Sequence, residues 1–276
     1  MTDSDLVNKP VSQLSYKGVT WKYCTRGTGP LTVVMFPGII GGLEMLDSHI
    51  QAFSKEHKVL AVAIPPLSSV ETFCEGLQHI LELEHTRRMI LLGASFGGFL
   101  AQAYFFRHPR QVERMILSDT DIPNRHRGNI NWLIRLGIKW APFFITRPLF
   151  TAKFNNLFNH PVPAEKAHLV EDSREKVKVW MKHHFTKEMF LSRMNLSIDY
   201  DAKERLLFDK LDNWQGKVLV TGSDDDPMWG ETEPIQDIYP QAQYHCFKGG
   251  GHLSQLLQFN DYVRIAGHFI KTGELP

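Results

Sequence analysis

The feature that most constrains this chain is a short turn in which a serine stands between two glycines. The turn Gly93-Ala94-Ser95-Phe96-Gly97 follows the apolar run 90–92, which favours a strand, and precedes apolar residues at helical spacing from Phe99 onward. Glycines let a strand and a helix approach more closely than residues with a Cβ. The pattern therefore predicts a tight strand–turn–helix unit that holds the Ser95 hydroxyl clear of the backbone, as a nucleophile requires.

Two later segments carry the side chains that such a serine needs for catalysis. A serine nucleophile requires a histidine that accepts its proton and a carboxylate that orients the histidine. The apolar strand 217–222 precedes three aspartates at 224–226, and the strand 243–247 precedes a run of glycines and His252. Because functional groups collect at the carboxyl ends of parallel strands, we expect Ser95, His252 and one aspartate to meet.

These motifs, in the order serine, acid and histidine, resemble the α/β-hydrolase family over residues 17–275. The resemblance implies Ser95 as nucleophile, His252 as base and an acid three residues after the loop glycine of the 217–222 strand, which is Asp225. Asp226 takes that role if the turn is one residue longer. Whichever aspartates do not bind His252 should face water, because adjacent negative charges repel one another.

The family resemblance leaves two further questions open. Some hydrolases place the acid after the preceding strand, where this chain has Asp119 and Asp121. Segments 73–76 and 93–102 are similar to the maspardin branch, whose members are regarded as binding or adaptor proteins. The resemblance therefore implies either a serine hydrolase or a non-catalytic adaptor on the same scaffold.

Backbone N–H donors for an oxyanion are expected at the turn after another buried strand. The apolar run 31–36 ends in the glycine-rich segment 37–42, where related hydrolases have a His-Gly pair and this chain has Pro37-Gly38. We assign the two donors to Ile39 and to Phe96, the residue after the serine. A plain turn is the alternative for 37–42. The chain contains no Gly-x-Gly-x-x-Gly motif, which argues against dinucleotide binding.

Strand and helix patterns alternate over the first 120 residues. Strands are predicted at 16–24, 57–64 and 112–118, and a helix at 70–84 carries apolar residues on one face. Such alternation favours an α/β fold with a mostly parallel sheet and helices on both faces. The stretch 122–213 has only helical patterns. We therefore predict a hydrolase core formed by 1–121 and 214–276, with an inserted helical cap at 122–213.

The predicted cap is rich in aromatic residues and methionines, which could line an apolar pocket over Ser95 or form the core of the cap itself. These residues are Trp132, Trp140, Phe143, Phe144, Phe150, Phe154, Phe158, Met181, Met189 and Met194. The arginines and lysines between Arg125 and Arg147 are interpreted as a solvated face.

The amino-acid composition indicates in which cellular compartment this protein works and which kinds of partner it does not bind. With 276 residues, 43% hydrophobic and 22% charged, and a net charge of +1, the chain resembles an ordinary globular enzyme and has no overall charge for nucleic acid or an acidic membrane surface. Three cysteines without metal-ligand spacing (Cys24, Cys74 and Cys246) favour reduced thiols. We see neither a signal sequence nor an apolar run of about 18 residues, and expect a cytoplasmic protein without membrane span, metal or organic cofactor.

The function predicted from these observations is hydrolysis of a small carboxylic ester through an acyl-enzyme, with a small-molecule acyl substrate. Lactone, amide or C–C substrates and an acyltransferase reaction on the same serine remain alternatives. A maspardin-like adaptor would instead bind a protein partner. A serine at the turn argues against haloalkane dehalogenases and epoxide hydrolases, since those families use an aspartate there.

Overall fold

The computed structural model describes residues 11–156, 164–203, 214–226 and 233–276. These residues form a sheet of eight strands in the order β1-β2-β4-β3-β5-β6-β7-β8. The first two pairs, β1–β2 and β2–β4, are antiparallel, and all other neighbours are parallel. The mostly parallel sheet predicted from the sequence is thereby confirmed. The strands are β1 Ser12–Tyr16, β2 Val19–Arg26, β3 Thr32–Phe36, β4 Lys58–Val62, β5 Met89–Ala94, β6 Val112–Ser118, β7 Lys217–Ser223 and β8 Gln243–Phe247.

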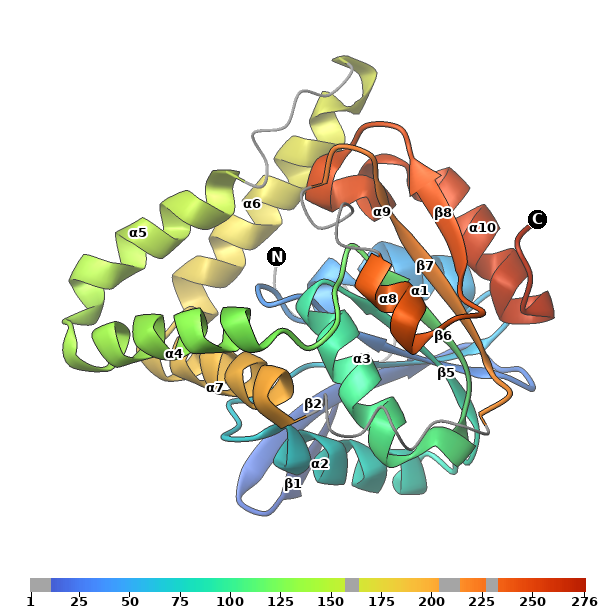
Figure 1. Cartoon of the computed structure of the whole chain (residues 1–276), viewed down its shortest axis with the longest axis horizontal. Coiled ribbons are helices and arrows are strands. Elements are labelled where there is room, and N and C mark those ends of the chain that lie inside the picture. The colour runs from blue at the N-terminus through green and yellow to red at the C-terminus, as the bar shows by residue number, and fades with distance from the viewer. Residues whose placement is uncertain (1–10, 157–163, 204–213, 227–232) are drawn as a thin grey trace.

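Helices cover both faces of the sheet (Figure 1). Side chains of α2, α3 and α8 pack in one apolar cluster, and those of α1 and α10 pack in another on the opposite face. The helices are α1 Asp47–Phe53, α2 Val70–Leu83, α3 Phe96–Arg107, α4 Arg125–Trp140, α5 Phe143–Asn156, α6 Ala167–His184, α7 Lys187–Lys203, α8 Glu233–Ile238, α9 Ser254–Leu257 and α10 Phe259–Thr272.

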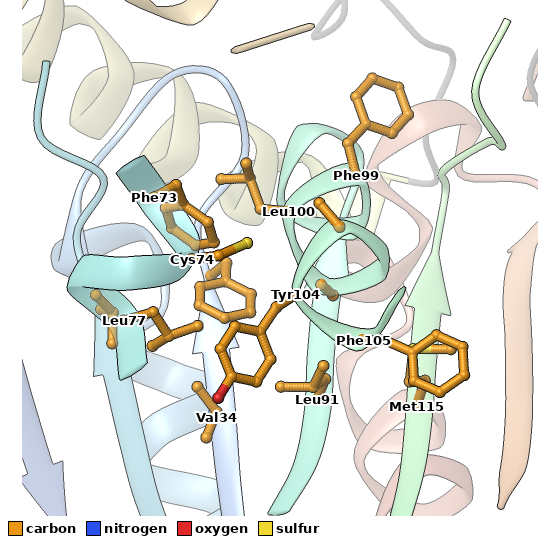
Figure 2. Close-up of a cluster of buried hydrophobic side chains, with 14 of the residues drawn as sticks. Val34, Phe73, Cys74, Leu77, Leu91, Phe99, Leu100, Tyr104, Phe105 and Met115 are labelled. Carbon is orange, nitrogen blue, oxygen red and sulfur yellow. The ribbon is translucent and has the colours of Figure 1, made fainter. Parts of the chain in front are cut away.

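The central strands are apolar throughout because each contributes to both clusters. In β3, Val34 and Phe36 join the cluster under α2 and α3, whereas Val33 and Met35 join the one under α1 and α10. Successive side chains of a strand point to opposite faces, so a strand covered on both sides needs apolar residues at every position. Figure 2 shows Val34 among side chains from α2, α3 and the neighbouring strands.

A glycine inside α2 has a packing role. A Cβ on Gly76 would lie 2.0 Å from Cζ2 of Trp21, whose indole is 1% exposed. Glycine normally destabilises a helix interior, so its presence here allows the Trp21 ring of β2 to lie directly on the helix backbone.

We therefore expect Gly76→Ala to destabilise the protein although alanine is the better helix former. Overpacking against Trp21 should cost about 1–3 kcal/mol, which exceeds the gain in helix propensity. Gly137→Ala in α4 is the matched control: no atom lies within 4 Å of its added Cβ, and about 0.5–1 kcal/mol of stabilisation is expected. Urea denaturation of both variants measures the difference. Stabilisation by both changes would contradict the packing role.

Helices α4 to α7 lie between β6 and β7 in the chain and to one side of the sheet (Figure 1). We call them the cap helices. Their shared core includes Ile138, Trp180, Phe185 and Phe190. A buried ion network ties them to the sheet: Arg127 of α4 lies 2.7 Å from Asp121, just after β6, and 2.6 Å from Asp201 of α7. The helical character predicted for this part of the sequence is present in α4–α7.

Some sequence-based boundaries were wrong. The strand predicted at 16–24 is the second arm of a hairpin, β1–β2, whose turn lies at Lys17 and Gly18 with positive φ angles. The strand predicted at 57–64 is shorter, since β4 ends at Val62.

Candidate active site

Ser95 occupies the turn between β5 and α3 with φ 51° and ψ −122°. A positive φ is unfavourable for a residue with a Cβ, so the surrounding contacts must hold it. The Ser95 N–H donates to the Ser118 carbonyl at 2.9 Å, and the Thr120 hydroxyl donates to the Ser95 carbonyl at 2.7 Å. Both partners belong to the end of β6 or the residues just after it, so the neighbouring strand fixes the serine in place.

The two glycines of the turn have the role that the sequence predicted. A Cβ on Gly93 would lie 2.3 Å from the Gly97 carbonyl oxygen, and a Cβ on Gly97 would lie 2.6 Å from that of Phe36. Neither position has room for a side chain, because the obstructing atoms are backbone. The start of α3 is thus packed directly on the end of β3.

His252 bridges the serine and a carboxylate. Its Nε2 lies 2.9 Å from Oγ of Ser95, and its Nδ1 lies 2.9 Å from Oδ2 of Asp226. The histidine sits in a short 3-10 turn, Gly251–Leu253, and the glycines at 249–251 all have positive φ angles. Glycine adopts this conformation without steric cost, which explains the glycine run before the histidine.

The structure brings Asp226 to His252, and not Asp225, which the family spacing had favoured. The reason lies in the length of β7. The strand continues through Ser223, which pairs with Phe247, so the turn begins one residue later than the spacing from Gly222 assumes. Its closing hydrogen bond runs from the Asp226 N–H to the Ser223 carbonyl at 3.1 Å. The fourth residue after the glycine consequently reaches the imidazole.

The other two aspartates of the loop are exposed, as charge repulsion predicted. Asp225 accepts hydrogen bonds from the Ser223 hydroxyl at 2.5 Å and the Gly251 N–H at 2.8 Å, so it supports the loop that carries the histidine. Asp224 accepts from the Gly249 N–H and lies 3.2 Å from Nζ of Lys248. The Gly249 hydrogen bond and then the lysine lower the pKa of Asp224.

Asp119 is the first of the two alternative acids. Among the described residues, its carboxylate makes no hydrogen bond to the His252 ring. Its carboxylate accepts from the Ser254 hydroxyl at 3.0 and 3.1 Å, and its backbone has φ 47°. Burial is the main cause that raises the pKa of Asp119 to about 7, and the Asp226 charge adds to the effect. Asp121, the other alternative, is bound to Arg127.

Opposing effects act on the pKa of His252. Burial lowers it, but the hydrogen bond and charge of Asp226, together with the charge of Asp119, outweigh burial and raise it above the ordinary 6.5. The site thus stabilises an imidazolium ion, which forms whenever the histidine accepts a proton from Ser95.

The expected oxyanion donors lie at adjoining backbone segments. Phe96 is the first residue of α3, so its N–H has no acceptor within the helix. Ile39 follows the end of β3 by three residues, and Gly97 packs against the carbonyl oxygens of Phe36 and Pro37 there. The loop after β3 and the start of α3 therefore lie together, as the assignment of Ile39 and Phe96 requires.

The aromatic residues and methionines of the cap divide into two groups. Met181, Met189 and Met194 are buried in the cap core, and Phe143, Phe150 and Phe154 pack against it. Trp132, Trp140 and Phe144 are exposed instead, and Phe158 lies outside the described residues. Most of the set thus forms the interior of the cap, and three of its rings face solvent. Ile40 and Leu253, neighbours of site residues, also touch this core.

Sequence reasoning missed two polar side chains close to the site. Ser254 follows His252 by two residues and binds Asp119, and its only signal was a hydroxyl at the start of a helix. Arg193 of α7 is buried, with its guanidinium carbon 5.8 Å from the centre of the Phe96 ring. No sequence motif marks it.

Within the described residues, no group of three His, Cys, Asp or Glu side chains is arranged to hold a metal ion. All three cysteines are free thiols, with Cys24 and Cys74 buried and Cys246 partly so. Among the helices that were searched, none combines the length and apolar character needed to cross a bilayer.

Solved structures with a similar overall fold are known. An esterase from Thermogutta terrifontis, 17% identical, superposes with a TM-score of 0.73 over 95% of this chain and 97% of its own. The enol-lactonase from Burkholderia xenovorans, 16% identical, gives 0.73 over 94% and 100%. An alpha/beta hydrolase enzyme from a Medee basin deep-sea metagenome library, 20% identical, gives a TM-score of 0.68 over 96% of this chain and 99% of its own. The chain has the α/β-hydrolase fold.

Two kinds of curated protein are similar in sequence to this α/β-hydrolase-fold chain. Maspardin from Homo sapiens is 24% identical over 245 residues, which cover 84% of this chain and 73% of maspardin. Proline iminopeptidase from Lactobacillus helveticus is 26% identical over 223 residues, which cover 73% of this chain and 71% of the peptidase. No protein-family model matches the chain.

Proposed function

We propose that this chain is a serine hydrolase that cleaves a carboxylic ester through an acyl-enzyme, with Ser95, His252 and Asp226 as its triad. The observation that carries the proposal is the hydrogen-bonded relay from the Ser95 hydroxyl through His252 to Asp226, with both bonds at 2.9 Å. Such a relay needs three segments far apart in the chain, and a purely structural histidine has no need of it.

In the proposed reaction, Oγ of Ser95 attacks the ester carbonyl while Nε2 of His252 takes the hydroxyl proton. Asp226 accepts a hydrogen bond from Nδ1 and stabilises the imidazolium charge. The N–H groups of Ile39 and Phe96 donate to the oxyanion of the tetrahedral intermediate. His252 then protonates the leaving alcohol, and a water molecule, activated by the same histidine, releases the acyl group from Ser95.

A carboxylesterase is favoured over the other acyl reactions on chemical grounds. Esters have better leaving groups than amides, so their cleavage depends less on protonation of the leaving group, although the same kind of triad also cleaves amides. The solved relatives include proteins named an esterase and an enol-lactonase, and the sequence relatives include a peptidase. We further propose that residues 122–213 act as a cap over Ser95, since α4–α7 lie between β6 and β7 and touch the loops around it.

Labelling with a fluorophosphonate probe tests the proposal directly, because the probe reacts only with a serine that a base has activated. We expect wild-type protein to gain the probe mass on the peptide containing Ser95, and Ser95→Ala to gain none. Hydrolysis of 4-nitrophenyl esters of increasing acyl length then defines the acyl preference. An unlabelled wild-type protein would contradict the enzyme proposal.

The similarity to maspardin supports a second candidate, an adaptor that binds a protein partner on a hydrolase scaffold. The two candidates differ in one measurable respect. An adaptor should bind its partner equally well before and after the Ser95→Ala change, and should lack the fluorophosphonate reaction.

The dependence of kcat/KM on pH is expected to follow the protonation of His252. Only neutral imidazole accepts the Ser95 proton, so kcat/KM should fall as the pH drops through the histidine pKa, which Asp226 raises above 6.5. In Asp226→Asn the raising charge is gone and burial remains, so the acidic limb of the residual activity should move to lower pH. A limb that stays in place would argue against Asp226 as the partner.

A further inference from the structure

The cap contains two arginines that are largely buried but have opposite surroundings. Arg127 of α4 is held between the carboxylates of Asp121 and Asp201, at 2.7 and 2.6 Å. These interactions outweigh burial and raise its pKa. Arg193 of α7 is 2% exposed, and burial lowers its pKa to about 10 with no described carboxylate to offset it.

The hydrogen-bond donors of Arg193 are mostly unused. Nη2 donates to the Ile64 carbonyl, just after β4, at 2.6 Å. Nε and Nη1 are buried and have no partner among the described residues. A buried cation without a counter-charge costs considerable free energy, so a chain that keeps one here has a reason beyond packing.

Attachment of α7 to the core does not require this charge. The adjacent Ser192 already accepts a hydrogen bond from the Leu67 N–H at 2.6 Å and ties the helix to the same loop. The single bond from Arg193 to Ile64 uses one donor of a group that has five. An apolar side chain of similar length would fill the space at lower cost.

The position of Arg193 connects it with the reaction site. Its guanidinium carbon lies 5.8 Å from the centre of the Phe96 ring, and Phe96 follows the nucleophile Ser95 directly. The Arg193 guanidinium thus lies beside the side chain of Phe96, one of the two proposed oxyanion donors.

We propose that Arg193 binds a carboxylate of the substrate, so that this hydrolase acts on anionic esters that carry a free carboxylate near the scissile bond. Binding of the carboxylate supplies the missing counter-charge and occupies the unused N–H donors. This inference rests on the proposed function and narrows its substrate class.

Two esters that differ in charge test the proposal: 4-nitrophenyl butyrate, which is neutral, and the mono-4-nitrophenyl ester of glutaric acid, which carries a free carboxylate. We expect wild-type protein to prefer the anionic ester. In Arg193→Met the ratio of kcat/KM for the anionic over the neutral ester should fall by about 10- to 100-fold, chiefly through KM. Arg193→Lys, which keeps the charge, should restore part of the ratio. Arg264→Met, an exposed arginine of α10, should leave the ratio unchanged.

The possible results separate the two proposals. Equal losses for both esters in Arg193→Met, or an unchanged ratio, would show a structural role and overturn the anion site. If wild-type protein hydrolyses neither ester and resists the fluorophosphonate, the proposed function fails. The anion site then has its own test in the Ser95→Ala protein: glutarate should raise its melting temperature, and adding Arg193→Met should abolish the rise. No rise with glutarate would overturn the site.

A second, independent observation concerns the outer corner of the cap. Of nine large apolar residues that are exposed in the described chain, seven lie between Ile130 and Leu149. The corner between α4 and α5 lies far from the sheet (Figure 1). Five side chains there are more than half exposed: Leu133, Trp140, Phe144, Ile145 and Leu149. We call these five residues the corner patch.

The stretch that carries the corner patch is one-sided in charge. Residues 125–156 contain six arginines and lysines and no aspartate or glutamate, although the whole chain has a net charge of only +1. One of the six, Arg127, is neutralised by Asp121 and Asp201, which leaves five cations in this stretch. Exposed aromatic and aliphatic side chains next to cations match the chemistry of a bilayer surface with anionic lipids. From this match we infer that the corner patch binds anionic membranes.

Co-sedimentation with lipid vesicles tests this inference. We expect the protein to bind vesicles that contain phosphatidylserine, to bind pure phosphatidylcholine less, and to dissociate as salt increases. Replacing Trp140 and Phe144 together with serine should abolish sedimentation. Leu83→Ser, which removes an exposed apolar residue from α2, should not. Absence of wild-type binding, equal binding by the double variant, or a dimer in solution that this variant dissociates would overturn the inference.

Discussion

Replacement of Ser95 or His252 by alanine is expected to lower kcat by about 10⁵- to 10⁶-fold, because nucleophile and base act as a unit. The two side chains share one hydrogen bond of 2.9 Å, and the reaction needs both of its ends. Removal of both in one protein should cost little more than removal of either. Rates are measured with a 4-nitrophenyl ester at saturating concentration.

In these variants, loss of activity through unfolding must be distinguished from loss of a catalytic side chain. Ser95 is held by its backbone bonds to Ser118 and Thr120, which alanine retains, so the melting temperature of Ser95→Ala should stay close to that of wild-type protein. A single variant with activity within threefold of wild type would contradict the assignment of that residue.

The second large effect distinguishes two adjacent aspartates. Asp226→Asn should lower kcat by about 10⁴-fold, because an amide neither stabilises the imidazolium nor fixes the tautomer. Asp225→Asn should keep most of the activity. Its amide oxygen can still accept from the Ser223 hydroxyl and the Gly251 N–H, which are the contacts of the native carboxylate.

This pair is a close control, since both substitutions replace the same side chain in the same loop with equal loss of charge. The contact with His252 at 2.9 Å belongs to Asp226. A larger loss in Asp225→Asn than in Asp226→Asn would restore the acid that family spacing suggests.

The sequence predicted the parts of this molecule that follow from local rules. The serine turn could be located because close backbone contacts at Gly93 and Gly97 exclude all other residues. The sheet could be anticipated from strands such as β3, in which burial on both faces demands an apolar residue at every position. Pairing of Ser95 with His252 followed from the positions of both residues at strand ends.

Features that depend on the exact length of a strand, or on which side chains meet in space, could not be predicted from the sequence. Pairing of Ser223 with Phe247 extends β7 and thereby selects Asp226, and nothing in the local sequence fixes where that pairing stops. The unpaired charge of Arg193 is likewise a property of its neighbours in space. The net charge also does not reveal how charge is distributed, because a chain near neutrality can still carry six arginines and lysines and no acidic residue over 125–156.

The backbone angle of Ser95 also bears on how this protein could be engineered. A residue with a side chain at φ 51° costs of order 1–3 kcal/mol that glycine would not incur. Selection for heat resistance without an activity screen would thus favour Ser95→Gly. The most stable variants of such a library would then lack the nucleophile and have no hydrolase activity. Any search for a more durable form should score turnover alongside survival.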